Sequence, residues 1–220
     1  MDRYTVTLTG KTPLLLHSDN IEWADVMDAW KNDPKNRAES KAGDDRSPAF
    51  RWIGCLYHNG RFLVVPQENI MRSIMEGGAM VPVPGGRGGK TFKSQTQSGI
   101  ALFGESWLLT VGGKAIDVGP INAMKAESDF AAHKEFAKER GFELFIKRAK
   151  IGQSKHIRVR PMFRTWELSG ELDVRDKQIT KDILGEILEY SGINKGLGDW
   201  RPGGKTPGPY GTFTATVKKH

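Results

Sequence analysis

The sequence predicts a single α+β domain with a mainly antiparallel sheet. Two amphipathic helix patterns, at 67–76 and 180–192, are separated by several strand patterns and do not alternate with them one by one. The chain has 220 residues, which is enough to bury a hydrophobic core without disulfide support. We therefore expect one domain over residues 1–220.

The first half of the chain begins with a strand pattern at 4–8, where apolar and polar residues alternate. Residues 21–30 carry a helical stripe after a capping sequence, and 32–48 is polar without periodicity, so it predicts a surface loop. A buried strand is predicted at 61–65, and the helix at 67–76 follows it and ends at a pair of glycines.

The second half adds a hairpin and closes with a strand, helix and strand. The predicted elements are a strand at 107–111, a polar amphipathic segment at 128–139, hairpin strands at 142–150 and 156–160, one or two strands over 163–172, a helix at 180–192 and a strand at 212–217. This order is matched most simply by a ferredoxin-like βαββαβ core, which is also the fold of RNA-recognition (RRM-like) modules. Three additions interrupt that core: a loop at 32–48, a glycine-rich loop at 82–99 and an inserted basic hairpin region at about 120–165.

Composition points to an anionic partner. The chain has 33 Lys and Arg against 26 Asp and Glu, a formal net charge of +7, and nucleic acid is the commonest partner of basic proteins. Cys55 is the only cysteine, which excludes an intramolecular disulfide and a thiolate metal cluster. Because the sequence has no signal segment, no membrane-length apolar run and no metal-ligand spacing, we expect a cytoplasmic protein without cofactor, metal or membrane contact.

The long connection at 196–213 is the most informative segment. It joins a helix to the last strand, contains six glycines and carries Arg201 and Lys205. Glycines let a ligand or a second backbone approach closely, and cationic side chains hold phosphates, so the loop suits a nucleic-acid backbone. The alternative is a connection whose glycines only serve turns. Trp200, Tyr210 and Phe92 are candidates for stacking on unpaired bases, although Trp200 and Tyr210 equally suit packing of the loop on the core.

The second glycine-rich loop, at 82–99, carries Arg87, Lys90 and Lys93. It resembles a nucleotide-binding P-loop, but that motif needs a glycine six residues before its lysine, where Pro84 stands here. We therefore reject an NTPase and expect a basic loop that contacts nucleic acid or a neighbouring subunit, with plain disorder as the alternative.

The predicted hairpin is the most basic part of the chain. No acidic residue lies between its first cation and Arg164, and strict alternation places Arg158 and Arg160 on one face of a strand. We therefore interpret this face as a surface that contacts phosphates. The alternative interpretation is a solvated outer face. The hairpin cations are Lys147, Arg148, Lys150, Lys155, Arg158 and Arg160, and Arg72, which lies off the buried face of the helix at 67–76, is a further candidate.

Three segments resemble the RAMP superfamily, which includes the backbone subunits of CRISPR effector complexes. In the first, at 60–76, an apolar strand, Pro66, Ile70 and a helix containing Arg72 fit, whereas residues 67–69 replace the small Gly-Ser-Ser of the family. The second, at 8–17, is similar to the family's first strand and loop. The third, made of 196–198 and 208–213, is similar to its C-terminal glycine-rich loop.

The resemblance implies an RRM-like core that binds single-stranded RNA along its backbone, repeats along the strand as a helical filament, and contacts the guide strand and a neighbouring subunit through a protruding hairpin. We therefore expect a non-catalytic subunit that binds single-stranded RNA (or DNA), copies of itself and other effector-complex subunits. Two alternatives stay open: an assembly protein, for example viral, and a RAMP-type endoribonuclease. Candidate catalytic residues for the latter are Asp44, Asp45, Asp19, His17, His58 and His156.

Overall fold

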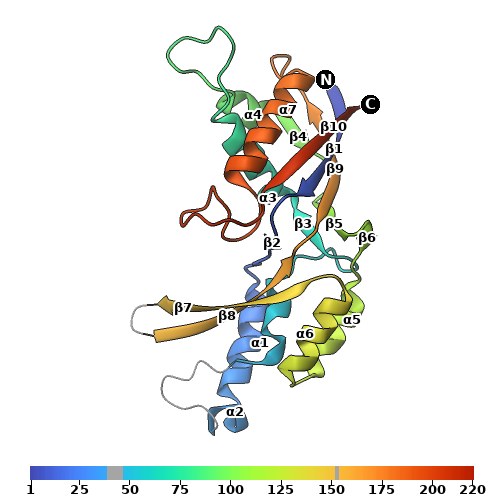
Figure 1. Cartoon of the computed structure of the whole chain (residues 1–220), viewed down its shortest axis with the longest axis vertical. Helices are drawn as coiled ribbons and strands as arrows, with labels where there is room; N and C mark the ends of the chain where they lie inside the picture. The colour runs from blue at the N-terminus through green and yellow to red at the C-terminus, as the bar shows by residue number, and fades with distance from the viewer. Residues whose placement is uncertain (39–46, 152–153) are drawn as a thin grey trace.

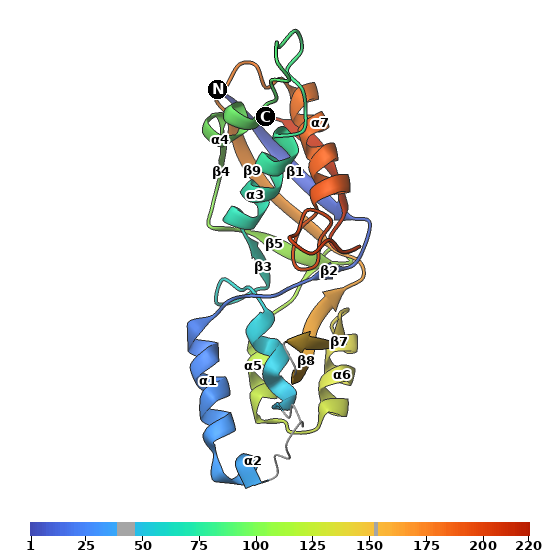
Figure 2. The same cartoon turned by 90° about the vertical axis from the view of Figure 1, so that its left-hand side faces the viewer.

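The computed structural model describes residues 1–38, 47–151 and 154–220, with the side chains of 38, 148–151 and 154–156 left out of the description. The molecule is elongated and has two parts that share one chain path (Figure 1). A large sheet with its helices forms the upper part, which holds both chain ends, and a small sheet with its helices forms the lower part. Figure 2 shows β2 (Leu14–Leu15) and the segment from β8 (Ser154–Phe163) to β9 (Glu167–Val174) running between them.

The strands of the large sheet differ in length, and neighbouring strands are antiparallel. Their order is β10-β1-β9-β5-β3. Two short strands extend it, since β4 also pairs with β9 and β6 pairs with β5. The strands are β1 (Asp2–Gly10), β3 (Val64–Pro66), β4 (Ile100–Leu102), β5 (Ser106–Val111), β6 (Lys114–Ala115), β9 (Glu167–Val174) and β10 (Phe213–Lys219).

Alternation along β1 explains how the sheet buries one face. Tyr4, Val6 and Leu8 are almost completely buried, whereas the intervening threonines lie on the opposite face. The helices α3 (Gln67–Gly78) and α7 (Lys181–Tyr190) cover the buried face (Figures 1 and 2). Each fully buried aliphatic side chain stabilises this packing by roughly 1.5–3 kcal/mol. The helices contribute Ile70, Ile74, Leu184, Ile187 and Leu188.

The small sheet has the order β2-β8-β7, and its strands are β2 (Leu14–Leu15), β7 (Glu143–Ile151) and β8 (Ser154–Phe163). Trp52 and Phe142 pack in its core with ring centroids 5.5 Å apart, and Trp52 Nε1 is hydrogen-bonded to His133 Nδ1 at 3.0 Å. The surrounding helices are α1 (Ile21–Asn32), α2 (Pro34–Ala38), η1 (Ala49–Cys55), α5 (Val118–Ala123), η2 (Met124–Ala126) and α6 (Phe130–Glu139).

The predicted hairpin is present as β7 and β8, which pair antiparallel over their whole length and project sideways from the body (Figure 1). The sequence prediction of a mixed α+β chain with antiparallel sheets is confirmed. None of the helices in the described ranges combines the length and apolar character that crossing a bilayer requires.

Two predicted loops contain helices, so those loop predictions are wrong in part. The loop expected at 32–48 includes α2. This helix begins at Pro34, and proline is favoured at the first position of a helix. The loop expected at 82–99 ends in α4 (Lys93–Gly99), so Lys93 is a helical residue. Polar residues dominate both segments, and neither short helix carries an apolar stripe that periodicity could detect. The carboxylate of Asp33 accepts a hydrogen bond from the backbone N–H of Lys35 at the start of α2, whereas α4 has no side-chain cap. Residues 39–46 lie outside the described part.

Candidate nucleic-acid interface

A groove separates the β7–β8 hairpin from the glycine-rich loop at 196–212, which lies directly above the hairpin in Figure 1. Its cavity volume is about 590 Å³. Side chains of both the hairpin and the loop line the groove, although the two segments are about 50 residues apart in the sequence. Its lining includes Phe145, Lys147, Arg158, Arg160, Asp199, Trp200, Arg201 and Lys205.

Strand register determines which hairpin side chains face the groove. Lys147 is paired with Arg158, and Phe145 with Arg160, so all four lie on one face of the two strands. The prediction that Arg158 and Arg160 share a face is thus confirmed. Lys147 and Arg158 are exposed and make no ion pair with any residue that the structure describes, which leaves both charges available to an anion.

Arg160 has a different environment, because its side chain is mostly buried and forms an ion pair with Asp199 of the glycine-rich loop. Burial lowers the pKa of Arg160, and the positive charge of the neighbouring Arg158 lowers it further. The pair ties the hairpin to the loop. Arg160 therefore shapes the groove, whereas the positive charges of Lys147 and Arg158 are exposed to solvent within the groove.

An aromatic cluster forms the wall of the groove beside these cations. The ring of Trp200 lies 5.5 Å from Tyr210 and 6.5 Å from Phe145, centroid to centroid, and Lys147 Nζ lies 3.0 Å from the centroid of the Trp200 ring. Trp200 also donates a hydrogen bond from Nε1 to the carbonyl oxygen of Pro207 at 3.2 Å. Trp200 thus packs the loop and at the same time presents aromatic surface to the groove.

The glycines of the loop are needed for close backbone packing. Gly198 and Gly211 have φ angles of +73° and +71°, which glycine adopts without strain. A Cβ atom on Gly211 would overlap the carbonyl oxygen of Leu197, and one on Gly198 would overlap that of Leu15. The loop is therefore a packed structure at these positions, and its glycines serve its own fold.

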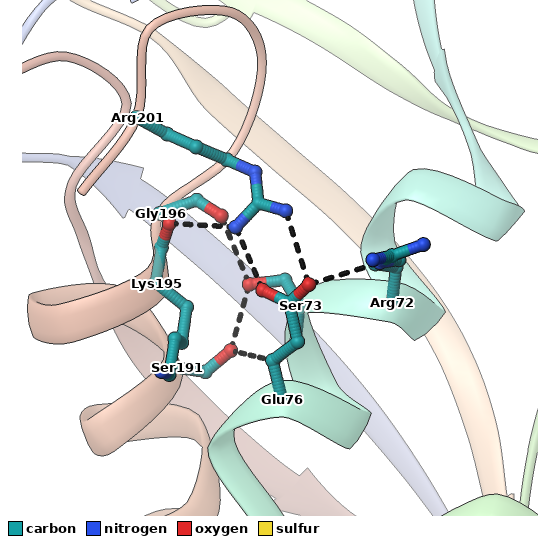
Figure 3. A network of polar contacts seen from close by, with 7 residues as sticks. All are labelled: Arg72, Ser73, Glu76, Ser191, Lys195, Gly196 and Arg201. Carbon is teal, nitrogen blue, oxygen red and sulfur yellow. Dashed lines mark hydrogen bonds and ion pairs between the residues drawn. The ribbon is translucent and has the colours of Figure 1, made fainter. Parts of the chain in front are cut away.

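The loop is also anchored to α3 by a network around Glu76 (Figure 3). Arg201 donates from Nη1 to Glu76 Oε2 at 2.7 Å and to the carbonyl oxygen of Lys195 at 3.0 Å. Arg72 donates from Nε to Glu76 Oε1 at 2.9 Å, but its side chain remains mostly exposed. Arg201 is mostly buried, so it holds the loop in place, whereas Arg72 keeps its terminal amino groups at the surface.

Two serines add a buried hydrogen-bonded contact next to this network (Figure 3). Ser73 of α3 donates to the carbonyl oxygen of Gly196 at 3.1 Å, and Ser191 Oγ donates to the carbonyl oxygen of Ser73 at 2.6 Å. Buried polar groups that are paired in this way rigidify the contact between two elements. These contacts with α3, together with the Arg160–Asp199 pair, hold the glycine-rich loop in place.

Acidification is expected to remove the contribution of Glu76 to stability. Burial raises the pKa of Glu76, but hydrogen bonds from Arg201 and Arg72 outweigh it, and the folded-state pKa lies below the ordinary value of 4.5. A lowered pKa stabilises the fold above pH 4.5 and ceases to do so as the pH falls through the folded value. Glu76→Gln is expected to lower the free energy of unfolding by about 1–2 kcal/mol at pH 7.

The measurement is urea unfolding of both proteins between pH 7 and pH 3. The difference between wild type and Glu76→Gln should shrink as the pH falls below about 5. A difference that stays constant over this range would show that the charge of Glu76 does not stabilise the network.

A smaller pocket of about 270 Å³ adjoins the groove and shares Asp199 and Arg201 with it. Tyr57 lines this pocket and donates from its hydroxyl to the carbonyl oxygen of His17 at 2.9 Å. Partial burial lowers the pKa of His17, and the positive charge of Arg160 lowers it further, so the ring is neutral at pH 7. We call this cavity the side pocket.

Several predicted site residues are not brought to the groove. Arg87 and Lys90 are exposed on the loop before α4, at the top of Figure 1, and do not line the groove; Lys93 lies exposed on α4 and does not line it either. Phe92 is 1% exposed, so the prediction that it stacks on bases is wrong. Three predicted cations have side chains outside the described residues; they are Arg148, Lys150 and Lys155.

Among the candidate catalytic residues in the described part of the chain, Asp19 lies near enough to His17 for its charge to oppose the lowering of the His17 pKa. Asp44, Asp45 and the side chain of His156 lie outside the described residues. His58 Nδ1 accepts a hydrogen bond from the backbone of Gly60 within a turn. No group of three His, Cys, Asp or Glu side chains suited to a metal ion occurs among the described residues.

Sequence reasoning missed Phe145, Asp199 and Glu76. Alternation along the strand places Phe145 on the face of Lys147, and that signal was present in the sequence. By contrast, Asp199 and Glu76 find their arginine partners 39 and 125 residues away, and no local pattern indicates such pairs. Comparison of the chain with known proteins yields no matching family model and no matching curated protein.

Proposed function

We propose that this protein is a non-catalytic subunit that binds single-stranded nucleic acid, with guide RNA as the expected ligand, in the groove between hairpin and loop. The observation that carries the proposal is the open charge of Lys147 and Arg158 beside the aromatic wall at Trp200. Cationic side chains hold phosphates, and aromatic rings stack on unpaired bases without regard to sequence. Lys205, exposed on the glycine-rich loop opposite the hairpin, adds a further phosphate contact.

The arrangement of the large sheet supports an RRM-like, ferredoxin-like core within the proposal. The order of β10, β1, β9 and β5, with α3 between β1 and β5 and α7 between β9 and β10, is the order expected of a βαββαβ unit. We propose on this basis, together with the resemblance of the segment at 60–76, that the chain is a RAMP-type subunit of a CRISPR-like ribonucleoprotein. Because fold alone does not give function, the groove carries the argument.

We further propose that copies of the chain assemble along the strand, together with other subunits of the complex. The strands β7 and β8 extend away from the body, so they are placed to meet a neighbouring molecule (Figure 1). Ile146, on the face opposite Lys147, is 49% exposed, which offers apolar surface to such a contact.

The test is fluorescence anisotropy with labelled oligouridine RNA and oligothymidine DNA, each also presented as a duplex. We expect single strands to bind more tightly than duplexes, since stacking needs unpaired bases, and the logarithm of the binding constant to fall linearly with the logarithm of salt. Failure to bind either single strand at 50 mM salt, a low-salt condition under which phosphate contacts are strong, would overturn the proposal.

Purification at low salt provides an independent check. Nucleic acid that co-purifies, in filaments that fall apart after treatment with RNase but not DNase, is the expected result for a guide-RNA subunit. Filaments that form without nucleic acid would instead support a structural assembly protein.

A further inference from the structure

The side pocket opens beside the groove and has a different chemistry. The groove offers exposed cations and aromatic rings, whereas the side pocket is lined by polar side chains, of which Asp199 and Arg201 are already paired; the lining includes His17, Tyr57, Asn69, Arg72, Asp199 and Arg201. Its volume of about 270 Å³ falls just below the range of about 300–1,000 Å³ found for small-molecule sites. Asp199 and Arg201 line both cavities, so the side pocket and the groove are neighbours.

We infer that the side pocket receives one unstacked purine base from the strand and reads its N7 edge. The inference rests on the proposed function and adds a specificity site to it. Bases that leave the stack are recognised in proteins by flat side chains and by hydrogen bonds to their edges. Tyr57 and His17 supply flat rings in this pocket.

The hydrogen-bonding groups of the pocket match purines. The carboxamide of Asn69 hydrogen-bonds the Tyr57 hydroxyl, and its oxygen and second N–H remain to match N6 and N7 of adenine. Arg72 uses Nε for Glu76, which leaves its terminal amino groups to match O6 and N7 of guanine. Both side chains come from α3, one turn apart, and line the same cavity.

Pyrimidines have no N7 edge, so they can meet Asn69 only through their Watson–Crick edge. Cytosine is read through its N4 donor by a carboxylate, and the carboxylate of this pocket, Asp199, already forms an ion pair with Arg160. Uracil and thymine lack an N7 acceptor. Arg201 is held by Glu76, so it lines the pocket without contributing a reading group.

The experiment compares a labelled 15-nucleotide oligouridine RNA with the same strand carrying one central adenine. We expect the adenine to tighten binding by about fivefold or more, the lower end of the discrimination that a bidentate base contact provides. Asn69→Ala is expected to abolish this preference while leaving the affinity for oligouridine within about twofold. Asn69→Asp keeps the shape but turns the donor into an acceptor, so it should favour a central cytosine over a central adenine.

The double variant Lys147→Gln with Arg158→Gln provides the matched control. It should weaken binding of both strands equally and keep their ratio, since it alters the phosphate contacts and the Lys147–Trp200 contact of the groove and leaves the lining of the side pocket unchanged. Equal affinity of the wild type for both strands, or a preference that survives both Asn69 substitutions, would overturn the side-pocket inference and leave the proposed function standing. Absence of binding to either strand would overturn the proposed function, and the inference with it.

Discussion

Replacing Lys147 and Arg158 together by glutamine is expected to weaken binding of single-stranded nucleic acid at least tenfold near 0.1 M salt. Both side chains are exposed on the groove face of the hairpin and, within the described residues, have no acidic partner. A hydrogen bond to a charged group contributes about 1.5–3 kcal/mol, and 1.4 kcal/mol corresponds to a tenfold change in affinity. Anisotropy titrations at several salt concentrations measure the change.

The salt dependence of the same titrations gives a sharper result. For a single strand, the slope of log K against log salt decreases by about 0.7 for each phosphate contact that is lost. The double variant should therefore reduce the slope by about 1.4 and should do so equally for strands of different sequence. Glutamine retains the polar character of the side chains, so that the loss reports on charge.

Lys147, and not Arg160, is substituted together with Arg158, because Arg160 forms an ion pair with Asp199. Reversing the charge of Arg160 would place a carboxylate against Asp199 in a mostly buried site and would damage the fold itself. Arg87→Gln with Lys90→Gln is the matched control, because it removes the same charge from an exposed loop away from the groove. Equal losses in the two double variants would contradict the groove assignment.

Substituting alanine for Gly211 is expected to destabilise the fold by about 3 kcal/mol or more. Gly211 has a φ of +71°, and an added Cβ would overlap the carbonyl oxygen of Leu197. Backbone strain of about 1–3 kcal/mol adds to a similar cost of overpacking. The backbone of Gly211 is also held by a 2.8 Å hydrogen bond to the carbonyl oxygen of Pro13, so it has little room to move away.

Thermal or urea unfolding measures this loss, with Gly88→Ala as the control. Gly88 has a similar φ of +68° but open space around its Cα, so alanine there should cost only about 1–2 kcal/mol. A Gly211→Ala protein as stable as the Gly88→Ala protein would contradict the view that the loop is packed through its glycines.

The main helices and strands were predictable because their signals are local. Alternation located the strand that became β1, and the apolar stripe of α7 with Thr180 as its N-cap located that helix. The same periodicity placed Arg158 and Arg160 on one face. The short helices α2 and α4 were missed, since neither carries a stripe of the length that periodicity needs.

The mixed α+β class, the basic hairpin and the glycine-rich loop could be predicted, because each follows from residue type and spacing along the chain. That the hairpin and the loop face each other across a groove could be seen only in the folded chain. The same holds for the pairing of Arg160 with Asp199 and of Arg201 with Glu76, and for the exposure of Lys147 and Arg158, which have no acidic partner among the described residues. An ion pair between distant residues depends on how sheets and helices pack, and local sequence patterns carry no record of that packing.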